Sequence, residues 1–326
     1  MKQTTAILLA AYNGEKYLKE QLDSIVGQTF TDWALFINDD GSTDSTPEIL
    51  RQYQNMYPDQ IFLSENTSGT HGATGNFADL FAKVSGYEYY AFCDQDDRWE
   101  PEKLSEMIHF LKNCQKKYDG PLLAYCTLRI TDQDMNPICD SLETYTHAAL
   151  GQKQHYRKLL LANYVPGCAM VFNDKLKNLV SSYPKEIDLH DWWILLLCAA
   201  FGRIVRKNDT PLSNYRQHSC NTLGVTNTRS TLDRILDNLR PSVFRKHLRS
   251  LTNCRRQAAT QTQTLLQVYG DRLSPEQRSL AQNVLALLRS GNRLKSVILG
   301  MKYPYLGNTL YERFTFWWFT IPKENR

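Results

Sequence analysis

The feature that most constrains the fold is an alternation, over the first 130 residues, between short apolar runs and amphipathic segments. Between the runs, apolar residues recur at helical spacing, as in Leu18, Leu22 and Ile25. Strands that alternate with helices form right-handed βαβ units, so the sequence predicts an α/β fold around a mostly parallel sheet with helices on both faces. The runs expected to be strands are TAILLAAY (5–12), WALFIN (33–38), IFLSE (61–65) and YYAFCD (89–94).

Polar or acidic residues follow these predicted strands directly. Ligands of open α/β sheets bind at the carboxyl ends of the strands. We therefore expect one ligand site to include the residues at three of these ends, namely Tyr12 and Asn13, Asp39 and Asp40, and Asp94, Asp96 and Asp97.

Asp94 and Asp96 are two residues apart where a strand ends, so in an extended chain their carboxylates point the same way. Two carboxylates in a short loop form a hard-oxygen site suited to Mg²⁺ or Mn²⁺. The alternative is a solvated loop that caps the next helix, because Asp stabilises helix N-termini. We expect the capping role for Asp97.

The segment INDDGSTDST (37–46) also has one structural and one functional explanation. Asp39 and Asp40 suit a strand-to-helix turn with side-chain capping. Alternatively, one carboxylate contacts a nucleotide base or ribose, as acids do after the second strand of dinucleotide-binding sheets. Neither GxGxxG nor GxxxxGK[ST] occurs, so phosphates here would depend on a metal ion and basic side chains.

The net charge of +4 conceals two different halves. Residues 229–326 contain 17 Lys and Arg against 6 Asp and Glu, a net +11, which leaves −7 for residues 1–228. We expect a catalytic domain over 1–225 and a basic, mainly helical region over 226–326, with the boundary near 222–229. The basic region is a candidate for binding an anionic surface.

The composition also indicates a cytoplasmic location. Charged and polar residues interrupt the first apolar stretch, so we expect no signal peptide. The longest apolar run, 192–201, is half of the roughly 20 residues that a membrane span needs. Eight cysteines at irregular spacing, without a CxxC pair, suggest reduced thiols rather than disulfides or a zinc site.

Taken together, LLAAYNGEKYLKEQLDSIVGQTFTDWALFINDDGSTDST and the later FCDQDDRWEPEKL resemble the family 2 glycosyltransferases, which have the GT-A fold. The resemblance is greatest to bacterial rhamnosyltransferase-type members that build cell-surface polysaccharides. It covers roughly residues 3–221.

The resemblance implies a nucleotide-sugar site at the three strand ends. Asp40 contacts the base with Asp39 beside it, and Asp94 and Asp96 hold Mn²⁺ or Mg²⁺ against the diphosphate. Gly75 replaces an Arg of the family pattern, which removes one expected diphosphate contact, while Asn66 stays a candidate. The predicted nucleotide-sugar-binding residues are Ala11, Tyr12, Asn13, Asp39, Asp40, Asn76, Asp94, Gln95 and Arg216.

Two later motifs complete the site that the resemblance implies. In LHDWWI, Asp191 matches the catalytic base, although Asp is also a good helix-start residue. In NYRQHSCN, His218 completes the metal site, although a lone His is often structural. Trp192 and Trp193 are predicted to stack on an acceptor sugar, with core packing as the alternative.

The predicted activity is transfer of a sugar, with rhamnose favoured, from a dTDP- or UDP-linked donor to a hydroxyl of a growing, lipid-linked polysaccharide. One base without a separate nucleophile implies inversion at the anomeric carbon, because retention needs a second carboxylate at the sugar. A catalytically inactive nucleotide-sugar- or saccharide-binding protein is the alternative.

The C-terminal region ends in an aromatic-rich segment, 302–322, with eight aromatic residues. Basic helices with interfacial aromatics suit the inner face of an anionic membrane, to which we expect peripheral attachment. The alternatives are a helical bundle that packs on the catalytic domain or on a second subunit, and nucleic-acid binding, which is the least favoured.

Overall fold

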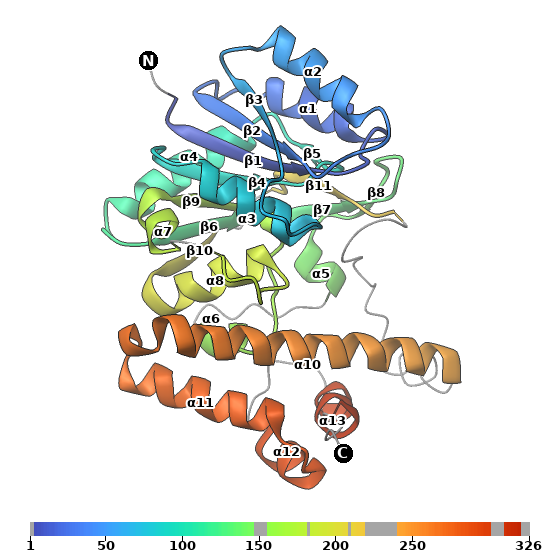
Figure 1. Ribbon diagram of the computed structural model, residues 1–326, viewed down its shortest axis with the longest axis vertical. Coiled ribbons are helices and arrows are strands. Elements are labelled where there is room, and N and C mark those ends of the chain that lie inside the picture. The colour runs from blue at the N-terminus through green and yellow to red at the C-terminus, as the bar shows by residue number, and fades with distance from the viewer. Residues whose placement is uncertain are drawn as a thin grey trace. The chain divides into compact units, whose positions relative to one another are not determined.

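The computed structural model describes residues 3–146, 155–180, 183–207, 210–218, 240–300 and 310–320, and the chain divides into two compact units (Figure 1). Unit 2 includes two segments that precede residue 190 in the sequence. Unit 1 comprises Met1–Thr144, Val165–Lys185 and Leu189–Val225, and unit 2 comprises Tyr145–Tyr164, Glu186–Asp188 and Thr226–Arg326.

Unit 1 is built on a seven-stranded sheet with the strand order β10-β6-β9-β4-β1-β2-β3. Strand β9 runs antiparallel to both of its neighbours, and the other adjacent pairs are parallel. The strands are β1 (Thr5–Ala11), β2 (Trp33–Asp39), β3 (Ile61–Glu65), β4 (Tyr89–Cys93), β6 (Leu122–Cys126), β9 (Met170–Asn173) and β10 (Arg203–Lys207).

The central strands are buried along nearly their whole length. Every residue of β4 and all but one of β1 are buried, as expected for strands covered on both faces, whose sequences are continuous apolar runs. The helices of this unit are α1 (Leu18–Val26), α2 (Thr46–Met56), α3 (Ala73–Lys83), α4 (Lys103–Gln115), α7 (Asp174–Leu179) and α8 (His190–Phe201), with the short α5 (Leu142–Thr146) crossing into unit 2.

A second, four-stranded sheet has the order β5-β11-β7-β8. It matters for the site because β5 begins directly after the acidic loop that follows β4, and β11 pairs with both β5 and β7. Its strands are β5 (Arg98–Trp99), β7 (Leu128–Thr131), β8 (Pro137–Cys139) and β11 (Ser213–Arg216).

Unit 2 is helical in its described part, and α10 and α11 lie side by side in orange in Figure 1. Its elements are α6 (His155–Leu159), α10 (Pro241–Tyr269), η2 (Gly270–Arg272), α11 (Pro275–Arg289), α12 (Arg293–Gly300) and α13 (Leu310–Phe319). The start of α11 has a capping box, in which the Ser274 and Gln277 side chains each accept a hydrogen bond from the other residue's backbone N–H. None of the described helices combines the length and the hydropathy needed to cross a bilayer.

These elements confirm the predicted α/β fold with a mostly parallel sheet and a helical C-terminal region. The apolar segment VPGCAMVF (165–172) is not a continuous strand. The structure has a 3-10 turn, η1 (Gly167–Ala169), before β9 begins at Met170. The turn carries Cys168 to the edge of the sheet, where it contributes to the site described next.

Candidate active site

Three neighbouring strands end at one edge of the main sheet. In the strand register Ala11 pairs with Asp39, and Leu9 pairs with Cys93. The residues after these strands therefore start from adjacent positions, which brings together the loops that begin at Tyr12, Asp40 and Asp94. This is the edge at which the sequence predicted a ligand site.

The loop after β1 is held by side chains from the other two loops. The Gln95 amide bonds twice to the backbone of Tyr12: Oε1 accepts from Tyr12 N at 2.9 Å and Nε2 donates to Tyr12 O at 2.9 Å. Asn13 has a φ of 44°, and its Oδ1 accepts a hydrogen bond from Thr43 N at 2.8 Å. Tyr12 itself is 54% exposed, so its ring is accessible to a ligand.

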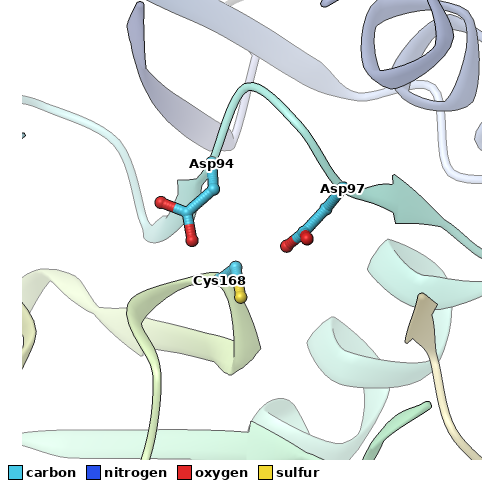
Figure 2. Close-up of side chains that lie close together, drawn as sticks. All are labelled: Asp94, Asp97 and Cys168. Carbon is cyan, nitrogen blue, oxygen red and sulfur yellow. The ribbon is translucent and has the colours of Figure 1, made fainter. Parts of the chain in front are cut away.

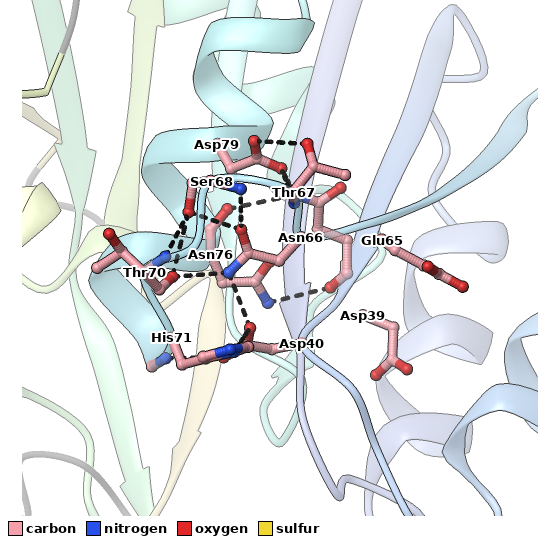
Figure 3. A network of polar contacts seen from close by, with 12 residues as sticks. Asp39, Asp40, Glu65, Asn66, Thr67, Ser68, Thr70, His71, Asn76 and Asp79 are labelled. Atoms are coloured by element: carbon pink, nitrogen blue, oxygen red, sulfur yellow. Dashed lines mark hydrogen bonds and ion pairs between the residues drawn. The ribbon is translucent and has the colours of Figure 1, made fainter.

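Asp39 and Asp40 have different environments. Asp39 accepts hydrogen bonds from the backbone N–H and the hydroxyl of Ser42, which is the turn-capping role. Asp40 is buried and bonds to the β3–α3 loop (Figure 3): its Oδ1 accepts from Asn66 Nδ2 at 2.8 Å and lies 2.8 Å from His71 Nδ1. Its Oδ2 accepts from Gly72 N at 2.7 Å.

Helix α3 packs closely against this loop. A Cβ added at Gly75 would lie 2.2 Å from Thr70 O, so the backbones meet where the family pattern has an Arg. Asn76 is 2% exposed, and its Nδ2 donates to Ala11 O at 3.2 Å and Asn38 O at 3.1 Å. It therefore ties the ends of β1 and β2 together. Its predicted contact with a nucleotide-sugar stays a prediction.

The loop after β4 directs two of its carboxylates inward. Figure 2 shows Asp94 and Asp97 pointing from the two ends of the loop toward Cys168 in η1. The ligand atoms of these three residues all lie within 4.8 Å of one another. Asp97 is fully buried; its Oδ1 accepts from Arg216 N at 3.1 Å, whereas its Oδ2 accepts no hydrogen bond from the described residues.

The expectation that Asp97 caps the following helix is wrong. Helix α4 begins only at Lys103, with Glu102 in the N-cap position. Asp97 instead lies in the interior, where burial raises its pKa well above the usual range and the carboxylates of Asp96 and Asp94 raise it further. A sequence pattern could not indicate this, because the backbone N–H that Asp97 accepts from belongs to a residue 119 positions away.

Asp96 points elsewhere, toward the strand β11 side of the loop. Its Oδ2 lies 2.8 Å from His218 Nε2, and the His218 ring packs on Tyr17 with the ring centroids 4.8 Å apart. The predicted metal ligands Asp94, Asp96 and His218 thus belong to two adjacent groups, one around Cys168 and one around His218. Their common role as ligands stays a prediction.

Arg216 links the acidic loop to its surroundings. The side chain is 3% exposed; Nε donates to Asp96 O at 2.8 Å, Nη1 donates to Gln133 O at 2.6 Å, and Nη2 pairs with Glu20. The guanidinium also lies over the Tyr17 ring, 4.3 Å from its centroid. In this structure Arg216 therefore organises the loop, and its contact with a diphosphate stays a prediction.

Asp191 lies in the first turn of α8 and is 8% exposed. Burial raises the pKa of Asp94 to about 7, and the Asp96 and Asp191 carboxylates raise it further. A Cβ added at Gly167 would be 3.4 Å from Asp191 Cβ. The same Cβ would lie 3.0 Å from His190 Nε2, so η1 packs tightly on the start of α8, one residue from the Cys168 that faces Asp94.

His190, beside Asp191, is a neutral packing residue. Its ring stacks on Phe77 with centroids 4.0 Å apart and meets Phe92 edge-on. Burial lowers the His190 pKa to about 3, and its Nε2 has no hydrogen-bond partner among the described residues. His190 is therefore uncharged near neutral pH, and Asp191 is the acidic residue in the first turn of α8.

The expected stacking of Trp192 and Trp193 on an acceptor sugar needs correction. Trp192 is 1% exposed and Trp193 is 0% exposed. Both rings belong to a helix whose first nine residues are all buried, so neither ring has a free face for a sugar. Core packing, the alternative given by the sequence, is what the structure contains.

The acidic loop fits a divalent cation. Two carboxylates with raised pKa values, those of Asp94 and Asp97, share the site, and the buried Asp97 Oδ2 has an unused acceptor position among the described residues. Oxygen ligands of this kind are those that Mg²⁺ and Mn²⁺ prefer. The sequence did not indicate that Cys168 and the buried Lys103 belong to this site. The available signal for Cys168 was the Gly167–Cys168 pair just before a strand.

The comparisons with known proteins agree with this geometry. The family model described as "Glycosyl transferase family 2" matches residues 6–180, more than half of the chain. The dTDP-rhamnosyl transferase RfbG of Shigella flexneri is 28% identical over 258 residues, which is 75% of this chain and 83% of RfbG.

Solved structures show the same fold at low identity. The S. aureus TarS 1–349 complex with UDP-GlcNAc is 14% identical, with a TM-score of 0.55 over 93% of this chain and 85% of that one. The Pyrobaculum calidifontis mannosyltransferase PcManGT, in complex with GDP-Man and Mn²⁺, is 14% identical, with a TM-score of 0.52 over 97% and 84%. Fold and family model together establish that this chain belongs to glycosyl transferase family 2, with a GT-A fold.

Proposed function

We propose that this chain is an inverting transferase that moves a sugar from a nucleoside diphosphate to an acceptor hydroxyl. One observation carries the proposal: Gly167 packs against Asp191 while the adjacent Cys168 lies beside Asp94, so a candidate base and a candidate cation ligand lie in the same site. Direct displacement requires this pair of functions side by side, a base for the acceptor proton and charge neutralisation for the departing diphosphate.

The donor is held at the edge where β1, β2 and β4 end. Tyr12 offers an exposed ring to the nucleotide base. Asp40 accepts a hydrogen bond from a base N–H after the β3–α3 loop releases the hydrogen bonds that it donates to this carboxylate. Ala11, Asn13 and Asp39 complete this part of the site. Rhamnose is the favoured sugar and dTDP the favoured nucleotide, on the similarity to RfbG.

The diphosphate lies against the acidic loop. Asp94 and Asp96, with His218, would hold Mn²⁺ or Mg²⁺, and the bound cation would neutralise charge on the leaving diphosphate. The Gln95 amide and the Arg216 guanidinium keep this loop in place against the β1 loop and Glu20. The loop therefore has a defined shape before a donor arrives.

Asp191 takes the proton of the acceptor hydroxyl as that oxygen attacks the anomeric carbon. It suits this role because it is partly enclosed yet 8% exposed, and because its neighbour His190 cannot compete for the proton near pH 7. No covalent sugar–enzyme intermediate is involved, so the anomeric configuration inverts. The acceptor is a hydroxyl of a lipid-linked, cell-surface glycan.

We further propose peripheral attachment of unit 2 to the anionic inner face of the membrane. No acidic residue occurs from Arg240 to Gly270, while Arg245 and Lys246 are exposed. Phe314 is 42% and Phe319 is 44% exposed, and Phe319 meets a ring of α10 edge-on. Exposed aromatics beside basic residues are typical of interfacial helices.

A panel of nucleotide-sugars tests the donor proposal. dTDP-rhamnose with Mn²⁺ should raise the melting temperature most, and NMR of the transfer product should reveal the inverted anomeric configuration. A retained configuration would contradict the single-base mechanism. Donor binding without transfer to any acceptor would favour the saccharide-binding alternative.

A further inference from the structure

Lys103 is a buried cation directly behind the acidic loop. It is 0% exposed, and no other lysine among the described residues is buried. Lysine is almost never fully buried unless its charge is compensated, because removing an ammonium group from water is costly. Some feature of its surroundings must therefore stabilise the charge.

The neighbours of the ammonium group lead to the acidic loop. Lys103 Nζ donates to Cys168 O at 2.7 Å and lies 3.9 Å from the centroid of the Trp99 ring, in β5 just after the loop. The Sγ of the same Cys168 lies within 4.8 Å of carboxylate oxygens of Asp94 and Asp97. One residue thus separates the buried cation from the two inward-facing acids.

No described carboxylate lies within ion-pair distance of Lys103; its Nζ contacts a carbonyl oxygen and an aromatic face. The ammonium group nevertheless lies only one residue from the two acids, because the Cys168 carbonyl accepts its hydrogen bond and the Cys168 Sγ lies beside their carboxylates. Through a low-dielectric interior, a charge acts over such distances with little screening.

We propose that Lys103 is a fixed counter-charge for the acidic loop: it holds Asp94 and Asp97 together when no divalent cation is bound, and it weakens the binding of that cation. The second part rests on the proposed function, because it assumes that the loop binds Mn²⁺ or Mg²⁺. Lys103 touches neither donor nor acceptor in this scheme, so it is a positioning residue.

A double-mutant cycle without metal tests the first part. Lys103→Met, which keeps the volume and removes the charge, should lower the melting temperature at pH 8 by about 6 °C or more. Asp97→Asn in the same chain should recover at least half of that loss, because it removes one of the repelling charges. Lys103→Arg should retain most of the wild-type melting temperature.

Matched controls separate charge from packing. Lys177 also lies over a ring, 4.0 Å from the Phe81 centroid, and Lys177→Met should show no coupling to Asp97→Asn. Likewise Asp119→Asn, at an exposed ion pair with Lys175, should not rescue Lys103→Met. Additive losses in the Lys103–Asp97 cycle would overturn the counter-charge. If Lys103→Met does not fold, a folded double variant supports the proposal and an unfolded one overturns it.

Mn²⁺ titration by calorimetry at pH 8 tests the second part. Lys103→Met should bind Mn²⁺ about tenfold more tightly than wild type, because a positive charge has been removed from beside the site. Equal or weaker binding would overturn this part. A wild-type protein that binds no Mn²⁺ contradicts the proposed cation site, whereas the metal-free cycle independently decides the role of Lys103.

Discussion

The two units both bury charge, but they compensate it differently. In unit 2, the Arg255 guanidinium donates to the carbonyls of Leu287, Leu288 and Ser290 at the end of α11 and to Thr320 Oγ1. In unit 1, Asp94 and Asp97 face each other, and one buried carboxylate oxygen accepts nothing from the described residues. The first arrangement is complete within the protein, whereas the second leaves acceptor capacity for a ligand.

The largest expected effect follows from the incomplete arrangement. Asp191→Asn should lower the transfer rate about 10²–10⁴-fold, because the amide cannot accept the acceptor proton. Donor binding, measured as thermal stabilisation by the nucleotide-sugar, should persist. Near-normal turnover would show that the base lies elsewhere. The acidic site of unit 1 would then not have the catalytic role that distinguishes it from the buried charge of unit 2.

Removing the Arg255 guanidinium from the complete arrangement in unit 2 should lower the free energy of unfolding. Arg255→Met leaves the carbonyls at the end of α11 without their buried donor, at a cost of about 3 kcal/mol in the free energy of unfolding. The neighbouring Arg256→Met is the control, since its ion pair with Asp188 leaves the side chain 61% exposed and such pairs contribute below about 1 kcal/mol. Equal losses in chemical denaturation would remove the distinction between the two arginines.

The buried His190 of unit 1 makes the free energy of unfolding depend on pH. Its pKa falls from 6.5 to about 3 on burial, so the unfolded chain binds the proton more readily. The stability it contributes is complete above pH 6.5 and is lost as the pH falls toward 3, by about 2 kcal/mol at pH 5. His190→Phe should reduce the loss of unfolding free energy between pH 7.5 and pH 5 by this amount, whereas His109→Gln, at an exposed position, should not.

The smallest effects concern the surface of unit 2. Lys246→Gln and Arg249→Gln should each weaken binding to anionic vesicles by about 1 kcal/mol, and added salt should weaken wild-type binding as well. Arg278→Gln serves as the control because Arg278 already pairs with Asp271 at 3.1 Å. Co-sedimentation measures all three, and binding that is indifferent to both substitutions would favour a bundle without a membrane role.

Much of the site could be predicted because its residues follow strands that periodicity identifies. The strand ends near Ala11, Asp39 and Cys93 were predicted to within one residue. The local partners were not predicted: Gln95 bonds to the Tyr12 backbone and Asn76 bonds to the ends of two strands. These contacts join residues 38 to 83 positions apart, and no local pattern records them.

The sequence by itself determined the alternation of strands and helices, the acids at the strand ends and the division of charge between the two halves. Only the tertiary structure decided which acids turn inward, that Trp192 and Trp193 are buried, and that Lys103 reaches the carbonyl of a residue 65 positions away. The physical reason is that hydrophobic periodicity and turn chemistry act between near neighbours. Burial and the charge around a carboxylate depend instead on segments that meet only when the chain has folded.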